Sequence, residues 1–200
     1  GIAILAAMAV SGVLGWAFER IVVRPVYGQH LKQILITTGG LIVAEQLLKV
    51  IWGPEQITLT RPEALRGAFL LGDIAVEKYR VLAVVIGLAV FAALSVTLNR
   101  TRIGLLIRAG VENGEMVEAL GYRIRRLFVG VFVAGSALAG LGGAMWGLYQ
   151  EVVTAAIGGQ VIVLVFIVII IGGLGSVGGC FVGALLVGLT ANYVGFLAPK

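Results

Sequence analysis

The sequence predicts an all-α integral membrane protein, a polytopic helical bundle with about six transmembrane spans and a short cytoplasmic helix. Hydrophobic residues make up 60% of its 200 residues and charged residues 12%, whereas soluble domains have about 25% charged residues. The mean hydropathy is +1.06. Apolar runs alternate with polar segments along the whole chain. We therefore expect a single transmembrane domain over residues 1–200.

The first apolar run, residues 2–18, ends at Glu19, Arg20 and Arg24. Because the ring of Pro25 disfavours helical backbone at Arg24, we expect the chain to leave the helix here and turn back through residues 19–31. The run starts at residue 1 without an initiating Met and without the basic start and cleavage site of a signal peptide. We therefore expect a chain truncated at its N-terminus, with further spans missing.

The second span, about residues 32–52, contains polar groups at membrane depth. Thr37, Thr38 and Gly39 combine hydroxyls with flexible backbone, so they are candidates for lining a substrate pathway. The alternative is that the threonine hydroxyls bond back to their own helix. Glu45 and Lys49 are functional candidates as intramembrane charges, but they are four residues apart on a helix and can neutralise each other.

Lys and Arg are retained on the cytoplasmic side of membrane proteins, and their distribution predicts the orientation. The segment 99–127 should be a cytoplasmic loop and the segment 53–79 an extracytoplasmic loop. Nine cations fall on the cytoplasmic side and four on the other. The nine are Arg20, Arg24, Lys32, Arg100, Arg102, Arg108, Arg123, Arg125 and Arg126; the four are Arg61, Arg66, Lys78 and Arg80.

Spans three and four, residues 80–98 and 126–149, flank the segment 99–127. The fourth carries small residues at every fourth position, which places them in one row where a neighbouring helix can approach closely. The row consists of Gly135, Ala139, Gly143 and Gly147.

A glycine-rich segment follows the fifth apolar run, residues 161–171. Gly173, Gly175 and Gly178 match a dinucleotide-binding turn, but that fingerprint needs an acidic residue about 20 positions further on, and none follows Glu151. We expect a sharp cytoplasmic turn instead, with tight packing against a sixth span at residues 181–197. The packing positions are Gly172, Gly173, Gly175 and Gly179.

The segment 99–127 contains the signals of a short helix, Gly114–Leu120. Asn113 is a good N-cap, Glu115 lies in the first turn and Gly121 suits the end of the helix. Such a short helix is marginal in water and must be held by packing, either at the lipid interface or in a groove of a partner protein. Its apolar side consists of Met116, Val117 and Leu120. Its acidic edge consists of Glu112, Glu115 and Glu118.

Several classes of function are disfavoured by the residues present. Cys180 and His30 are the single cysteine and histidine, which argues against a disulfide, a metal site and a cofactor centre. Ser176 has no convergent base for nucleophilic catalysis, so we expect no catalytic residue. The basic residues flank apolar runs instead of forming one stripe, which argues against nucleic-acid binding.

Ordered motifs along nearly all of the chain resemble the permease subunit of branched-chain amino acid ABC importers. They are Glu19-Arg20, Arg24-Pro25, Thr37 to Gly39, Thr101 to Gly104, Arg108-Ala109, Glu118 to Tyr122, Ser136 to Gly147 and Gly172 to Gly179. The resemblance implies that the residues around Glu112–Gly121 form a coupling helix that docks on an ATPase. The implied coupling residues are Arg108, Glu112, Glu115, Met116, Glu118, Ala119, Leu120 and Gly121.

The resemblance also implies partners and a place in the cell. The partners are a second permease subunit, identical or different, two cytoplasmic ATPase subunits and an extracytoplasmic substrate-binding protein. The implied location is the bacterial or archaeal inner membrane. The chain itself is not expected to be an enzyme, because the partner ATPase subunits hydrolyse ATP. The expected substrates are branched-chain or related amino acids, with urea, amides and other small solutes left open. The alternative function is an ion-gradient-driven secondary transporter or channel for a small polar solute.

Overall fold

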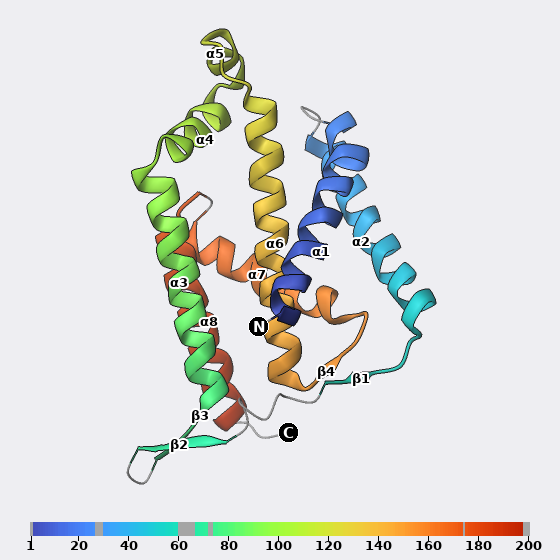
Figure 1. Cartoon of the computed structure of the whole chain (residues 1–200), viewed down its shortest axis with the longest axis vertical. Coiled ribbons are helices and arrows are strands. Elements are labelled where there is room, and N and C mark those ends of the chain that lie inside the picture. The colour runs from blue at the N-terminus through green and yellow to red at the C-terminus, as the bar shows by residue number, and fades with distance from the viewer. Residues whose placement is uncertain (1, 27–29, 60–66, 72–73, 174, 198–200) are drawn as a thin grey trace. The chain divides into compact units, whose positions relative to one another are not determined.

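The computed structural model describes residues 2–26, 30–59, 67–71, 74–173 and 175–197 (Figure 1). It is dominated by helices, as predicted. The helices are α1 (Ile2–Phe18), α2 (His30–Trp52), α3 (Lys78–Arg100), α4 (Arg102–Glu112), α5 (Gly114–Ala119), α6 (Ile124–Gln150), α7 (Ile157–Gly172) and α8 (Val177–Leu197). Four stretches are long and apolar enough to cross a membrane, namely 2–23, 31–52, 78–100 and 124–150, and α7 and α8 are shorter apolar helices within the described chain.

The chain divides into two compact units. The first unit comprises residues 1–83 and 105–155, and the second comprises residues 84–104 and 156–200. The first therefore contains α1, α2, α5 and α6, and the second contains α7, α8 and most of α3.

Helix α1 ends at Phe18, directly before Glu19, as predicted, but the chain does not leave the helical path there. It continues as a π-helical turn, Glu19–Val23, and a short 3-10 turn, Arg24–Val26. Glu19 is only 1% exposed and Val23 2%, so the charge at position 19 is packed inside the unit and does not mark its surface. The 3-10 turn includes Pro25 and ends at Val26. Arg24 has helical backbone angles (φ −54°, ψ −41°), so the expectation that Pro25 forces Arg24 out of the helical region is wrong.

Helices α1 and α6 form the main packing contact of the first unit. The Ser11 hydroxyl donates to the Ser136 carbonyl oxygen at 2.7 Å. A Cβ atom on Gly12 would lie 3.5 Å from the Ala137 side chain, and one on Gly140 would lie 2.6 Å from the Ser11 side chain. Small residues on both helices therefore allow the two backbones to approach closely.

The segment between α2 and α3 contains strands that the sequence analysis did not predict. Strand β1 (Ile57–Thr58) pairs antiparallel with β4 (Val152–Val153), which follows α6. Strands β2 (Ala68–Leu71) and β3 (Ile74–Glu77) form an antiparallel hairpin before α3. Two residue pairs that contain proline, Gly53-Pro54 and Arg61-Pro62, break any continuous helix in this segment. The first follows α2 directly, and the second lies outside the described residues.

In the second unit, α7 and α8 pack through their glycines. A Cβ atom on Gly172 would overlap the backbone of Cys180, and one on Gly179 would overlap the backbone of Gly172. The turn between the helices uses positive φ angles at Gly173 (81°) and Gly175 (93°), which cost little only for glycine. The rings of Phe91 and Phe181 stack with their centroids 4.2 Å apart.

Candidate functional site

Helix α5 has six residues, and its N-terminus is capped by a side chain. The side-chain oxygen of Asn113 accepts a hydrogen bond from the Met116 N–H at 3.0 Å. After the helix, the Gly121 N–H donates to the Glu118 carbonyl at 2.9 Å, and Gly121 has a φ of +87°. The N-cap and the terminating glycine are thus present where the sequence predicts them.

The apolar residues of α5 divide between two environments, although the sequence analysis grouped them on one side. Val117 is only 6% exposed, and α5 packs on α6. Met116 and Leu120 are 64% and 71% exposed. One apolar residue therefore anchors the helix to its own protein, while two others, four residues apart, are left on the surface.

Helix α4 precedes α5 and was not predicted. Its Gly110 is buried, and a Cβ atom there would lie 2.6 Å from the Ile124 side chain and 3.3 Å from the Phe128 ring, both on α6. Helix α4 therefore packs against the start of α6 through this glycine. The expected coupling residues lie on α4 (Arg108, Glu112), on α5 (Glu115, Met116, Glu118, Ala119) and in the following turn (Leu120, Gly121).

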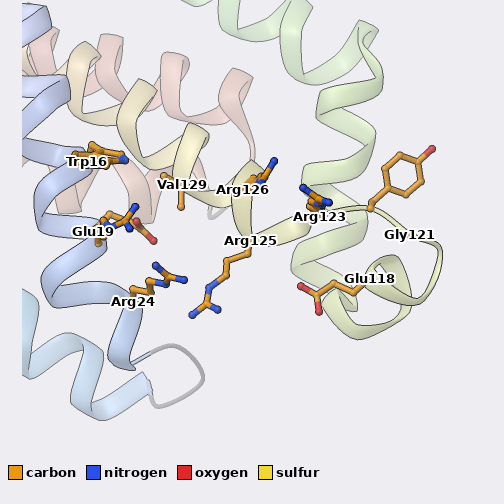
Figure 2. A pocket seen from close by; sticks show the side chains of 11 residues that line it. Trp16, Glu19, Arg24, Glu118, Gly121, Arg123, Arg125, Arg126 and Val129 are labelled. Carbon is orange, nitrogen blue, oxygen red and sulfur yellow. The ribbon is translucent and has the colours of Figure 1, made fainter.

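A basic pocket of about 730 Å³ lies between the end of α1 and the start of α6 (Figure 2). Sequence reasoning missed it, because it treated the arginines only as markers of orientation. The signal was the presence of arginines directly after the first span and at the start of the fourth, but the sequence does not show that these two spans are neighbours. The pocket is lined by Trp16, Glu19, Arg20, Arg24, Glu118, Gly121, Tyr122, Arg123, Arg125, Arg126 and Val129.

The threonines of the expected substrate pathway bond to their own helix. Thr37 Oγ1 donates to the carbonyl oxygens of Gln33 (2.8 Å) and Ile34 (3.0 Å). Thr38 Oγ1 donates to the Ile34 carbonyl at 2.8 Å. No described atom outside the helix backbone comes within 4 Å of a Cβ placed on Gly39. The hydroxyl protons are thus used locally, and the oxygen lone pairs are what a ligand could still engage.

The charged pair of α2 is neutralised within the helix. Lys49 Nζ and Glu45 Oε1 lie 2.7 Å apart, as the four-residue spacing suggested. The carboxylate of Glu45 therefore has its counter-ion on the same helix. This arrangement favours the structural explanation for the pair over a role in an ion pathway.

The predicted small-residue row of α6 differs from the surface that contacts α1. Gly135, Ala139 and Gly143 are exposed, and no described atom lies within 4 Å of a Cβ placed on Gly135 or Gly143. Gly147 is buried, and a Cβ there would lie 2.8 Å from Val153. The α1 contact uses Ser136, Ala137 and Gly140 instead.

Ser176 has a structural role in the turn before α8. Its hydroxyl oxygen accepts a hydrogen bond from the Gly179 N–H at 3.0 Å, and its carbonyl accepts from the Cys180 N–H at 2.9 Å. These bonds satisfy backbone donors at the start of α8. The serine therefore caps a helix in the glycine-rich segment.

Long apolar helices and a short capped helix with exposed apolar side chains define a polytopic helical membrane protein. Comparison with known sequences identifies it more closely. The family model of the branched-chain amino acid transport system permease component matches residues 1–199. The chain therefore belongs to this family of transport permeases.

Curated relatives of the chain carry matching descriptions. The high-affinity branched-chain amino acid transport system permease protein BraD of Pseudomonas aeruginosa is 27% identical over 196 residues, covering 96% of this chain and 64% of the relative. The corresponding LivH proteins of Salmonella typhimurium and Escherichia coli are each 25% identical, covering 92% of this chain and 61% of the relative. The chain thus spans somewhat less than two thirds of these relatives. No solved structure matches it significantly.

Proposed function

We propose that this chain forms part of the translocation pathway of an ATP-driven importer of branched-chain or related amino acids. The family match over residues 1–199 carries the proposal. The substrate class is taken from the descriptions of the relatives, which are permeases for branched-chain amino acids. The cell compartment is then the cytoplasmic membrane of a bacterium or archaeon, which the chain crosses several times.

The proposal assigns energy input to contact with an ATPase at α5. Met116 on α5 and Leu120 in the following turn are exposed, whereas Val117 of α5 is buried and the helix packs on α6. An apolar pair on a short amphipathic helix suits a groove in a partner. A force on α5 reaches α6 through Val117, so the partner can shift α6 without touching a membrane span.

The acidic edge of this surface fits a partner groove with basic character. Glu112, Glu115 and Glu118 are exposed and surround the apolar pair on the chain. Charge complementarity at the rim of an interface raises the association rate and suppresses wrong partners. We therefore expect the ATPase groove to combine an apolar floor with Lys or Arg residues at its rim.

The proposed orientation places the segment 99–127 in the cytoplasm and 53–79 outside. The nine-to-four distribution of cations supports it. Two ATPase subunits then act from the inside, a binding protein delivers substrate from the outside, and a second permease subunit completes the pathway. The exposed row Gly135, Ala139 and Gly143 is the surface we assign to a neighbouring helix of this assembly.

Thr37, Thr38 and Gly39 remain our proposal for the substrate pathway. Each threonine hydroxyl donates its proton to α2 and so presents lone pairs as acceptors. The ammonium group of an amino acid is a donor that such lone pairs can hold. Gly39 leaves space beside them.

ATP dependence is the test of the proposed function. The complete permease, its ATPase and its binding protein are reconstituted in liposomes, and uptake of labelled leucine is measured with ATP or with an imposed ion gradient. We expect uptake with ATP and the binding protein, and no uptake with a gradient alone. Uptake on a gradient without the ATPase would overturn the proposal in favour of a secondary transporter.

A further inference from the structure

We propose that the basic pocket between α1 and α6 holds the phosphate group of an anionic phospholipid. Its lining has five arginines and two glutamates, which leaves an excess of positive charge in a space large enough for a lipid headgroup. The arginines come from two separate parts of the chain, the helical turns that directly follow α1 and the start of α6. The site is thus assembled by the fold, and its lining does not include the exposed pair Met116 and Leu120.

The arginine side chains are available to an anion. Figure 2 shows Arg24 and Arg125 extending into the same space from the two elements. Both are exposed, as are Arg123 and Arg126. Among the described residues, these four guanidinium groups make no ion pair with a carboxylate. A phosphate is the ligand that several converging guanidinium groups recognise best, through paired N–H donors.

The helix end adds to this electrostatic preference. The first turn of α6 contains no acidic residue and instead contains Arg125 and Arg126. Cations at a helix N-terminus are disfavoured by the helix dipole, and an anion there is favoured. A bound phosphate would offset both the dipole and the mutual repulsion of the arginines.

The apolar part of the lining favours a lipid over a free phosphate. Trp16 in α1 lies one turn before Arg20 of the π-helical turn, and its ring centroid is 5.5 Å from the Arg20 guanidinium carbon. Val129 lies one turn after Arg125 in α6. Both residues are thus on the membrane side of the arginines along their helices. A ligand that fills the pocket meets cations at one end and apolar groups at the other, as a phospholipid does.

The pocket also borders the coupling region, because Glu118 and Gly121 line it. A phosphate held by Arg24 and Arg125 joins the end of α1 to the start of α6 beside α5. The lipid would thus stiffen the base on which the short helix rests. The proposal itself concerns binding and stands whether or not an ATPase docks on α5.

Fluorescence of Trp16 tests the proposal. The variant Trp52→Phe, Trp146→Phe keeps Trp16 as its one tryptophan and is placed in phosphatidylcholine nanodiscs with brominated phosphatidylglycerol or brominated phosphatidylcholine at equal mole fractions. We expect several-fold stronger quenching by the anionic lipid. Changing Arg24→Gln and Arg125→Gln together should bring quenching by the two brominated lipids close to equal, since each basic residue near the membrane surface contributes strongly to the attraction of anionic lipid.

Two control variants separate the pocket from general charge. Arg100→Gln with Arg102→Gln removes the same charge from the predicted cytoplasmic side of the chain but outside the pocket, and it should keep the preference. Arg24→Lys with Arg125→Lys keeps the charge but loses the paired N–H donors, so it should retain only part of the preference, in protein that circular dichroism shows to be equally helical. Equal loss in the pocket and control variants, or no preference in the parent, would overturn the proposal.

A further arm distinguishes the source of the phosphate. Inorganic phosphate or glycerol phosphate is added at millimolar concentration to nanodiscs of phosphatidylcholine alone. A Trp16 response to these ions without any lipid preference would overturn the lipid assignment in favour of a free phosphate. If the arginine changes instead abolish only ATPase recruitment, the pocket takes an acidic group of a protein partner and the proposal fails.

Discussion

The Asn113 side chain accepts a hydrogen bond from the Met116 N–H at 3.0 Å and closes the first turn of α5. This one bond sets the helix start so that Val117 is buried and Met116 is exposed. A helix of six residues has little intrinsic stability, because nucleation is costly and few propagating bonds follow. The cap and the Val117 contact therefore decide whether the surface of α5 is formed before a partner arrives.

Asn113→Ala should weaken the coupling helix without affecting membrane insertion. Loss of an N-cap costs about 1 kcal/mol, which is a large part of the free energy that can stabilise a single short helix. We expect reduced stimulation of the ATPase and faster amide exchange in residues 114–119, with Asn113→Asp close to wild type. Unchanged exchange in Asn113→Ala would show that packing alone holds the helix.

The double variant Met116→Asp, Leu120→Asp should uncouple transport while the protein stays inserted. Both side chains are exposed, so the change costs the isolated permease little, but it buries two charges in the proposed ATPase groove. Since truncating a central interface residue costs about 2 kcal/mol or more, we expect uptake to fall more than tenfold. The matched variant Met116→Leu, Leu120→Met keeps the apolar surface and should transport normally. Normal uptake by the aspartate variant would contradict docking at this surface.

Much of the helical architecture follows from the sequence. The predicted spans at residues 32–52 and 80–98 correspond to α2 (His30–Trp52) and α3 (Lys78–Arg100), because hydrocarbon-length apolar runs leave few alternatives. Helix α4 escaped prediction since its Gly104 and Gly110 lower helix propensity, whereas in the structure Gly110 provides a packing contact. A strand of two residues, such as β1, is too short to show an alternating pattern in the sequence. Its partner strand β4 also lies far along the chain.

The candidate site was predictable only in part. The cap at Asn113 and the glycine at position 121 are local signals, and both were read from the sequence. The basic pocket depends on Arg24 and Arg125 meeting across two helices, which no local pattern encodes. Likewise, the spacing of Gly135 and Gly143 shows that they share a face of α6, but it does not show that α1 packs on Ser136 and Gly140 instead.

Thr37→Val tests the proposed substrate pathway. The variant removes a hydroxyl that bonds only to its own helix in the described structure, so protein stability should change by less than about 1 kcal/mol. If the hydroxyl oxygen also accepts from the substrate ammonium group, the KM for leucine should rise about tenfold, because bonds to charged groups contribute about 1.5–3 kcal/mol. Thr190→Val removes a similarly back-bonded hydroxyl on α8 and serves as the control. Equal KM values for both variants would exclude Thr37 from the pathway.

Leucine substitutions at two glycines of α6 should separate internal packing from assembly. At Gly140, a larger side chain must displace the Ser11 side chain and the Ala7 carbonyl, and such overpacking costs about 1–3 kcal/mol. Gly140→Leu should therefore lower the melting temperature of the isolated permease. At Gly143 no described atom lies within 4 Å of the added Cβ, so Gly143→Leu should leave that temperature unchanged. If the row containing Gly143 receives a neighbouring helix of the assembly, Gly143→Leu should instead reduce recovery of the second permease subunit in pull-down experiments. Full recovery with Gly143→Leu would place the neighbouring helix on another face of α6.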